Sequence, residues 1–398
     1  MLVAFLTPPI AVAVPRALAI VLPLGALLAA AGAWREGTLR WPPRVPTILV
    51  VALLAWGGLS AIWALHPALV RSAWGPTAGL GITGVVLLGV ARDIEDDARL
   101  RIGMALASGV VMALALLFIE WTSGLLFEKS LGALIYTGRP FHTFIFNRGA
   151  ASLAILLWPA AYAVHLRFGR RAAAALVAAA FLIIAPFDSL AAVVGLGMGL
   201  VVWLVAAWRP RPAAIVLAGA IVAGAIAIPV LPQVPAVAAL AQRHEMPVSI
   251  SHRLNIWRFA GEAVAQRPLL GWGLNASRNM PGGSELSPSG QSRLPLHPHN
   301  AFLQWWLELG AVGAALGTAF LLAAIGGAMR LDPGGTDRRL PQAAALATIA
   351  SATLVAAVGY GIWQAWWLAV LWIAAALVAA APSSQASLKS VARLPESH

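Results

Sequence analysis

Residues 297–300 read His-Pro-His-Asn, and after nine further residues positions 310–313 read Gly-Ala-Val-Gly. Pro298 disfavours helix at the residue before it, so we expect His299 and Asn300 to open the apolar helix that follows. An imidazole changes its charge near neutral pH and can take up or donate a proton there. The spacing therefore predicts a reactive or anion-binding histidine at the mouth of a helix. The alternative is an ordinary polar helix cap.

Arginines lie in the same stretches of sequence as other polar residues outside the apolar runs. The members of this set are Arg139, Arg148, Arg243, Arg253 and Arg258. A guanidinium binds phosphate through paired hydrogen bonds and keeps its charge at all relevant pH values. Arginines beside a histidine at a membrane surface therefore indicate a lipid-linked pyrophosphate as ligand. For Arg139, Arg243 and Arg258, snorkelling to lipid headgroups is an equally simple interpretation.

The composition limits the kinds of structure that can hold these residues in place. The chain has 398 residues, of which 60% are hydrophobic and 11% charged, and its mean hydropathy is +0.82. Soluble domains are nearer half apolar and a quarter charged, so a water-soluble or disordered chain is excluded. Cysteine is absent, so disulfides and thiolate metal sites are excluded as well.

Apolar stretches predict a helical membrane protein, because a helix that crosses a bilayer needs about 20 apolar residues. Twelve windows qualify as candidates: 2–14, 17–33, 46–64, 73–91, 102–119, 149–166, 172–187, 189–207, 213–231, 301–329, 341–361 and 363–381. The first two windows are either separate helices or one long, kinked span. We therefore predict an all-α, polytopic membrane helix bundle with about twelve transmembrane helices.

The basic residues also predict which side of the membrane each loop faces. Most of the 27 lysines and arginines lie in the even-numbered loops and the C-terminal tail, where every short loop carries some of them. Cytoplasmic loops are enriched in this way, whereas long loops cross largely regardless of their charge. The long segments 120–148 and 232–300 are therefore predicted to face outward, on the side away from the cytoplasm.

The second long segment contains a predicted amphipathic helix from Ser249 to Gln266. Leu254, Trp257 and Val264 recur at helical spacing, and Pro268 ends the pattern. A helix of this kind is typical of a membrane surface, so its simplest interpretation is an interfacial anchor.

Several classes of mechanism lack the residues that they need. The apolar windows contain few ionisable groups, Glu308 being one exception, which argues against an ion relay. The only dense acidic run, 93–97, is predicted to be cytoplasmic, so a divalent-metal site on the outer side is disfavoured and no metal ligands are assigned. No phosphate-binding Gly-Lys-Ser/Thr loop is present to drive an ATP-dependent pump.

These residues resemble the signature of the O-antigen ligase family, which is His, then Asn, Ser or Gln, nine residues, Gly, two residues and Gly. Residues 251–257, Ser-His-Arg-Leu-Asn-Ile-Trp, together with 268–273, Pro-Leu-Leu-Gly-Trp-Gly, resemble the family's large periplasmic loop. Residues 63–67, Trp-Ala-Leu-His-Pro, are similar to its early Trp-Ser-x-x-Pro turn. The predicted topology, with the long loop before the tenth apolar window, agrees with this resemblance.

The resemblance implies a glycosyltransferase that needs no metal or other cofactor. It would move a glycan from undecaprenyl pyrophosphate to lipid A–core or another glycan acceptor, on the periplasmic face of a bacterial inner membrane. The implied partners are these two substrates and membrane lipid, with no nucleic acid. The polyprenyl chain would lie in a groove lined by Trp305 and Trp306, which are equally explained as residues of the aromatic belt.

By position in the motifs, His299 is the implied catalytic histidine and Arg253 the arginine that holds pyrophosphate. A second family arginine follows a serine near the eighth window, but there this chain has Leu190, and we propose Arg148 as its substitute. The predicted substrate-binding residues are Asn147, Arg148, His252, Trp257, His297 and Asn300, together with Arg139 and Arg243.

The domain organisation that follows is 1–231 for helices one to nine, 232–300 for the periplasmic loop with catalytic elements, 301–381 for helices ten to twelve, and 382–398 for a cytoplasmic tail. Three other functions remain open. An O-antigen or exopolysaccharide polymerase and a protein O-oligosaccharyltransferase share the donor chemistry. A lipid-carrier transporter or flippase belongs to a different class and would transfer no sugar.

Overall fold

The computed structural model describes residues 1–126, 129–130, 146–240, 248–287, 290–331 and 339–382. Its helices are α1 Leu2–Ala13, α2 Leu18–Arg35, α3 Arg44–Leu59, α4 Pro67–Arg92, α5 Asp96–Thr122, α7 Asn147–Phe168, α8 Arg170–Ile184, α9 Leu190–Trp208, α10 Pro210–Ala227, α11 Pro235–Leu240, α12 Val248–Gln266, α13 Ala301–Met329, α14 Arg339–Val358 and α15 Ala365–Ala379. Within the described residues the nearest approach to a sheet is one isolated bridge between Leu286 and Ser292. The predicted all-α class is confirmed.

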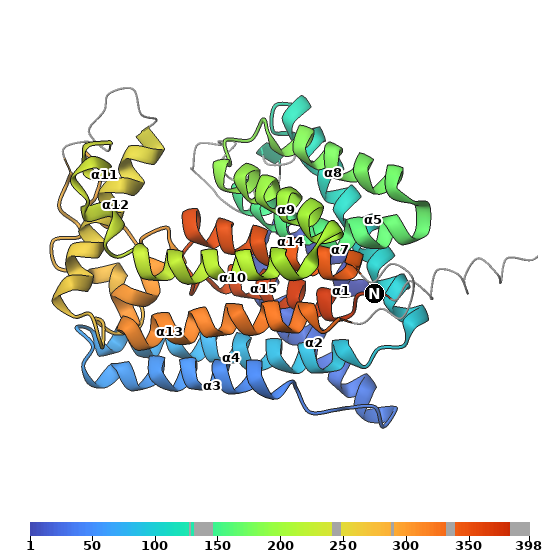
Figure 1. Ribbon diagram of the computed structural model, residues 1–398, viewed down its shortest axis with the longest axis horizontal. Helices are drawn as coiled ribbons and strands as arrows, with labels where there is room; N and C mark the ends of the chain where they lie inside the picture. Colours follow the sequence, from blue (N-terminus) through green and yellow to red (C-terminus); the bar gives the residue numbers. More distant parts are fainter. Residues whose placement is uncertain (127–128, 131–145, 241–247, 288–289, 332–338, 383–398) are drawn as a thin grey trace, which may run out of the picture.

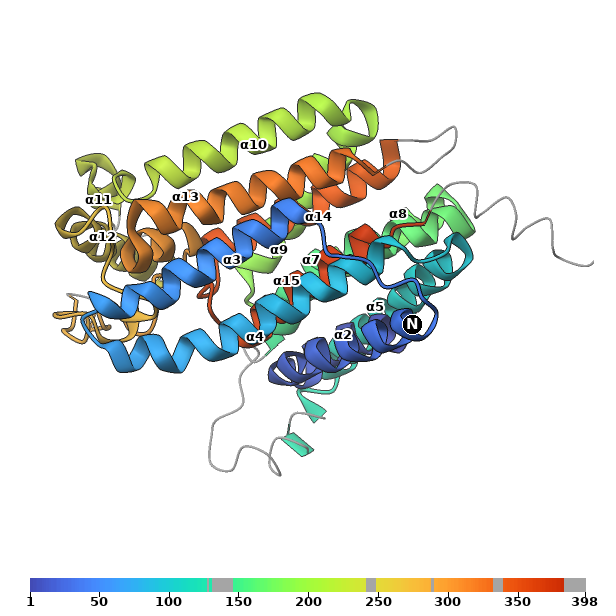
Figure 2. The same cartoon turned by 90° about the horizontal axis from the view of Figure 1, so that it is seen from below.

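Each of the twelve apolar windows coincides with a helix. In the described part of the chain, nine helices are long and apolar enough to cross a membrane, while α1 and α15 are apolar but shorter. The structure is therefore compatible with a polytopic membrane bundle, and the predicted number of about twelve transmembrane helices stays a prediction. α3, α4, α10 and α13 run along the long axis of the bundle, and α11 and α12 gather at one end of it (Figures 1 and 2).

The first two windows are separate helices that fold back on each other. A Cβ atom built on Gly25 of α2 would lie 2.9 Å from Cγ2 of Val3 in α1. Gly25 and Val3 lie at similar distances from the turn at residues 14–17, so the two helices are antiparallel neighbours. The alternative of one long, kinked span is wrong for this chain.

α7 forms the centre of the bundle, and its residues 149–164 are all buried. Trp158 of α7 donates its indole N–H to Ser351 Oγ of α14 at 2.7 Å, and Ser351 donates in turn to the Gly195 carbonyl of α9 at 2.8 Å. Small residues on α9 allow this close approach, as expected for helices that pack in a membrane. This core holds α7, α9 and α14 together.

α12 differs from the simple membrane anchor that its sequence pattern suggests. Its buried side chains are Ile256, Phe259, Ala260, Ala263 and Val264, and they pack against residues of the loop that follows and against Leu303 and Leu307 of α13. Leu254 and Trp257, which the pattern assigned to the apolar stripe, are only partly buried. The apolar face of α12 is thus covered by protein, which holds the helix over the end of α13.

α13 bends where the glycine of the signature lies. Gly310 has φ +64°, and a Cβ atom there would lie 2.2 Å from the Leu269 carbonyl oxygen, so only glycine fits. Carbonyls left without helical partners accept hydrogen bonds from elsewhere, as Leu307 does from the Trp272 N–H at 3.0 Å and Leu309 from Trp56 Nε1 at 2.9 Å. The bend therefore joins the long loop to α13 without leaving these backbone groups unsatisfied.

Candidate active site

The predicted histidine stands at the start of α13 in an unusual backbone conformation. Asn300 caps the helix, because its Oδ1 accepts a hydrogen bond from the Leu303 N–H at 3.0 Å. His299 has φ +55°, in the left-handed region that a non-glycine residue adopts only where its surroundings fix it. Its Nδ1 donates to the Gly359 carbonyl at 2.7 Å. In the neutral ring the lone pair is therefore on Nε2.

His297 contacts both the ring and the backbone of His299. The two ring centroids are 4.3 Å apart, and His297 Nδ1 faces the backbone N–H of His299 at 3.2 Å. His297 Nε2 lies 2.9 Å from Gln364 Nε2. A Cβ atom on Gly361 would come within 2.8 Å of the His297 ring, so the absence of a side chain at residue 361 allows the close approach. Both histidines thus rest on the segment 359–364.

The surroundings keep both imidazoles neutral at pH 7. Burial lowers the pKa of His297 to about 3, with smaller contributions from His299 and Arg278. The pKa of His299 is also lowered, first by burial and then by the charges of Arg253 and His252, although the Gly359 carbonyl opposes this shift. A neutral His299 with a free Nε2 lone pair has the protonation state of a base.

Arg253 and Arg148 converge on Tyr360, from α12 and α7 respectively. Burial raises the pKa of Tyr360, and the charges of Arg148 and Arg253 oppose that increase. The Tyr360 ring lies edge-on to the Trp366 ring, with 4.8 Å between the centroids. Arg148 also lies over the Trp366 ring, 5.7 Å from its centroid. Since Arg253 acts on His299 as well, His299, Arg253, Arg148 and Tyr360 form one cluster.

Arg148 lies near the position at which the family's second arginine is expected. Asn147 Nδ2 donates to the Asp188 carbonyl at 3.4 Å, and Phe146 packs edge-on against Phe187 at 5.6 Å. The start of α7 is therefore adjacent to the turn before Leu190. Leu190 itself is 49% exposed.

The remaining predicted residues of α12 attach that helix to the histidine segment. Trp257 Nε1 donates to the Pro298 carbonyl at 2.8 Å, and His252 Nε2 donates to the Ser292 carbonyl at 3.2 Å. Arg258 forms an exposed ion pair with Glu262, in which 3.2 Å separate its Nε from Oε1. Its guanidinium therefore contacts a protein side chain. Arg139 and Arg243 lie outside the described residues.

Trp305 and Trp306 contribute to packing within the bundle. Trp305 is buried, and its ring lies edge-on to Phe302 at 5.6 Å. Trp306 Nε1 donates to the Ala225 carbonyl of α10 at 2.7 Å. The interpretation of Trp305 as an interfacial belt residue is therefore wrong, because its ring is enclosed by protein.

A buried carboxylate joins three segments next to the histidines. Glu308 of α13 is fully buried and accepts hydrogen bonds from Ser277 Oγ, from the Asn275 N–H at 2.5 Å and from Trp363 Nε1 at 2.6 Å. Glu308 also accepts a hydrogen bond from Gln304 Nε2 at 2.9 Å. The Oε1 atom of Gln304 accepts in turn from the Ile362 N–H at 2.9 Å. Four donors satisfy the two oxygen atoms of the buried Glu308 side chain.

The segment 359–364 is the part of the site that sequence reasoning missed. Its residues were assigned to the ends of the apolar windows 341–361 and 363–381, although they include Gly359, Tyr360 and Gln364. The signal was available, because a polar glutamine and two glycines in so short a turn, followed by Trp366 and Trp367, are unusual in a simple connection. Within the described residues, no group of three or more His, Cys, Asp or Glu side chains is placed to hold a metal ion.

The fold and this cluster define a polytopic helical membrane protein with a basic, histidine-containing site at one end of its bundle. In a comparison with known families, residues 173–317 match the family described as O-Antigen ligase. The matched segment contains α12, the histidine pair and the bend at Gly310. Over these residues the chain is similar to the O-antigen ligase family.

Curated relatives agree with this placement over most of the chain. A Rickettsia conorii protein is 26% identical over 341 residues, which cover 84% of this chain and 79% of the relative. A Rickettsia prowazekii protein is 27% identical over 329 residues, 80% of this chain and 76% of the relative. A Rickettsia typhi protein is 26% identical over 345 residues, 83% and 79% respectively. All three are provisionally named polysaccharide ligases.

Proposed function

We propose that this chain is a glycosyltransferase of the O-antigen ligase type. It moves a glycan from undecaprenyl pyrophosphate to a lipid A–core acceptor, without a metal, on the periplasmic side of a bacterial inner membrane. The observation that carries the proposal is the convergence of His299, Arg253 and Arg148 around Tyr360 and Gly359. The names of the relatives, as polysaccharide ligases, support the same class of substrate.

The two arginines bind the leaving group. A pyrophosphate gains negative charge as its bond to the sugar breaks, and preorganised cations stabilise that charge most in the transition state. Arg253 is partly buried and Arg148 lies against Trp366, so neither side chain has to be ordered from bulk water at the moment of reaction. Each guanidinium can bind phosphate oxygens through two parallel hydrogen bonds.

His299 acts as the general base. Its Nδ1 proton is held by the Gly359 carbonyl, so Nε2 accepts the proton of an acceptor hydroxyl. The hydroxyl oxygen forms a bond to the anomeric carbon, and the bond from that carbon to the pyrophosphate oxygen breaks. The electron pair leaves with undecaprenyl pyrophosphate, and the configuration at the anomeric carbon is inverted by this single displacement.

Transfer by the purified protein tests this proposal. With an undecaprenyl-pyrophosphate-linked glycan as donor and purified lipid A–core as acceptor, we expect wild-type protein to form the joined glycolipid. His299→Ala removes the base and Arg253→Ala a stabilising cation, and we expect each rate to fall by about 10²–10³-fold. Arg267→Ala, which changes an exposed arginine outside the cluster, is the control. Full activity in both cluster variants contradicts the proposal.

The glycolipids of a deletion strain separate ligation from the related activities. Loss of polymer from mature lipopolysaccharide, with long lipid-linked polymer accumulating, is the result expected for a ligase. Chains of one repeat unit indicate a polymerase instead, and loss of glycan from a protein indicates a protein glycosyltransferase. Purified protein that moves carrier lipid between leaflets but transfers no sugar indicates a flippase.

A further inference from the structure

A cavity of about 340 Å³ lies directly beside His297. Its polar wall comes from the loop before α13 and from the segment 359–364, and its apolar wall comes from the first turns of α4. The side chains that the argument uses are Arg278, His297, Trp363 and Gln364 on the polar wall, with Leu69 and Ala73 opposite. His299, Arg253 and Arg148 are not among its lining residues, so it is a separate space from the pyrophosphate cluster.

Arg278 gives this cavity its charge. The side chain is exposed, and its Nε donates to Asn275 Oδ1 at 3.0 Å, which orients the guanidinium. Its positive charge contributes to the low pKa of His297, so the two side chains lie close together. In the described part of the chain, its two terminal nitrogens have no hydrogen-bond partner. An oriented arginine of this kind is suited to a carboxylate or phosphate.

The polar wall is fixed before any ligand arrives. Glu308 accepts hydrogen bonds from the Asn275 backbone and the Trp363 indole, while Gln304 holds the Ile362 N–H. Gln364 is held by His297 on one side and accepts from Trp366 Nε1 at 2.7 Å on the other. Small-molecule sites are mostly preformed, with apolar walls, a few placed polar groups and volumes of about 300–1,000 Å³. This cavity has all of these features.

We propose that the cavity binds the acceptor, as a saccharide that carries a negatively charged group. The inference rests on the proposed function, which requires an acceptor hydroxyl next to His299. The anionic group binds Arg278, the sugar lies between Trp363 and the α4 wall, and the reacting hydroxyl extends past His297 to His299. Because the two histidine rings are in contact, the cavity and the pyrophosphate cluster meet at the base.

Acceptor kinetics with two matched acceptors test the proposal. The donor is an undecaprenyl-pyrophosphate-linked glycan, and the acceptors are purified lipid A–core and the same material after phosphatase treatment. Arg278→Ala removes one charge-assisted contact, so we expect its KM for the phosphorylated acceptor to rise about tenfold while kcat stays near wild type. With the phosphatase-treated acceptor, the variant and wild type should have equal KM values. Arg278→Lys should restore part of the difference, and Arg267→Ala should behave as wild type.

Binding of undecaprenyl pyrophosphate separates this proposal from the proposed function. Arg278→Ala should bind that lipid as wild type does, whereas Arg253→Ala should lose binding. If wild-type protein neither binds the lipid nor transfers glycan, the proposed function fails and this inference fails with it. Two results overturn only the cavity assignment, provided that wild-type protein transfers glycan. One is an Arg278→Ala variant whose acceptor KM equals that of wild type, and the other is a variant that loses activity equally with both acceptors.

A second variant tests the shape of the cavity without touching its charge. Ser72 lines the cavity on the exposed face of α4, so Ser72→Phe narrows the space without disturbing a buried contact. We expect a raised acceptor KM with unchanged binding of undecaprenyl pyrophosphate. An unchanged acceptor KM contradicts the assignment.

Discussion

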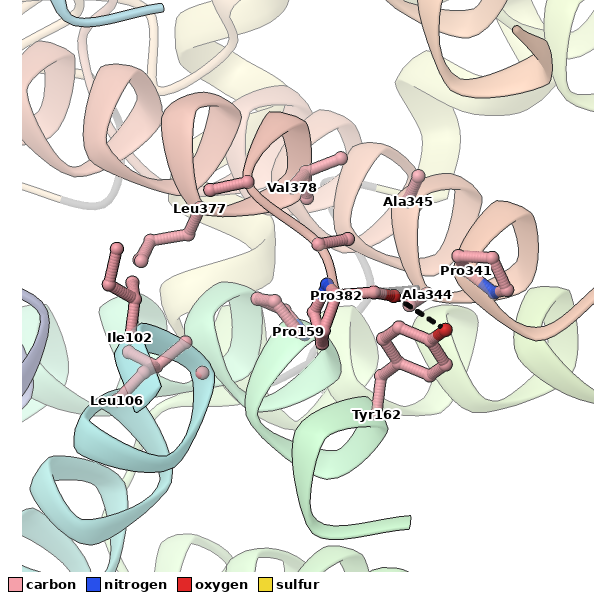
Figure 3. Close-up of a pocket in the computed structure, with 13 residues that line it drawn as sticks. Ile102, Leu106, Pro159, Tyr162, Pro341, Ala344, Ala345, Leu377, Val378 and Pro382 are labelled. Atoms are coloured by element: carbon pink, nitrogen blue, oxygen red, sulfur yellow. Dashed lines mark hydrogen bonds between the residues drawn. The ribbon is translucent and has the colours of Figure 1, made fainter. Parts of the chain in front are cut away.

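The two ends of the helix pair α14 and α15 differ in the role of their polar side chains, which form a candidate site at one end and stabilise the fold at the other. At one end, the segment 359–364 places Tyr360 beside the cluster of His299, Arg148 and Arg253, and Gln364 in the wall of the cavity next to His297 and Arg278. At the other end, Tyr162 of α7 donates its hydroxyl to the Pro382 carbonyl at 3.0 Å and the side chains close around it (Figure 3). The cavity there measures only about 10 Å³, about one water molecule.

The difference lies in what the polar groups contact. Tyr162 is 1% exposed and lines the small cavity together with Ile102, Leu106 and Pro159. Its hydrogen bond to the Pro382 carbonyl satisfies a buried hydroxyl, and the cavity has no space for a ligand. The charges of Arg148 and Arg253 act on Tyr360, and both of these arginines are only partly buried. Similar residue types are therefore structural at one end and form a candidate site at the other, because only one end combines open space with charge.

The largest expected effect is the loss of the buried carboxylate that joins the site together. Glu308→Ala leaves four donors without their acceptor, and we expect a loss of about 3–5 kcal/mol of stability, with no measurable transfer. Thermal unfolding of the purified protein in detergent measures it. Tyr162→Phe is the matched variant at the opposite end, and we expect a loss of about 1 kcal/mol with normal transfer. Equal losses in the two variants contradict a special role for the network around Glu308.

The second-largest expected effect tests the role of Arg148 as the second cation of the cluster. Arg148→Ala removes one of the two cations at Tyr360, and we expect the transfer rate to fall by about 10²-fold, with acceptor KM unchanged. Since Leu190 is exposed beside the start of α7, Leu190→Arg in the same chain places a guanidinium where the family has one. We expect this double variant to recover part of the rate, measured by the same transfer assay. If the double variant recovers no activity although the Leu190→Arg single variant is active, Arg148 is not a substitute for an arginine at residue 190.

The smallest effect is a change in the pH dependence. A base must be unprotonated, and the pKa of His299 is lowered from the ordinary histidine value of about 6.5, so kcat should be constant above pH 6.5 and fall only at lower pH. His252→Gln removes a positive neighbour and should move this fall to a slightly higher pH. The measurement is the kcat profile between pH 5 and 8. A fall that begins above pH 7 contradicts a base with a lowered pKa.

Local sequence was sufficient for the helices and for the helix start at Asn300. Apolar windows located each membrane-embedded helix, because a bilayer permits few other structures for an apolar chain. His299 and Asn300 were expected to open the helix, and in the structure Asn300 caps it. Periodicity alone did not identify which face of α12 is buried, because Ile256 and Phe259 pack on α13, far away in the sequence.

The sequence by itself determined a membrane-embedded helical chain, and it placed a candidate histidine at the start of one helix with arginines in the long segments around it. Only the tertiary structure decided that the segment 359–364 completes the site, that Glu308 holds it, and that Arg278 faces a separate cavity. The reason is physical. Apolarity and capping act between residues a few positions apart, whereas the pKa of a buried histidine and the shape of a cavity depend on side chains that only folding brings together.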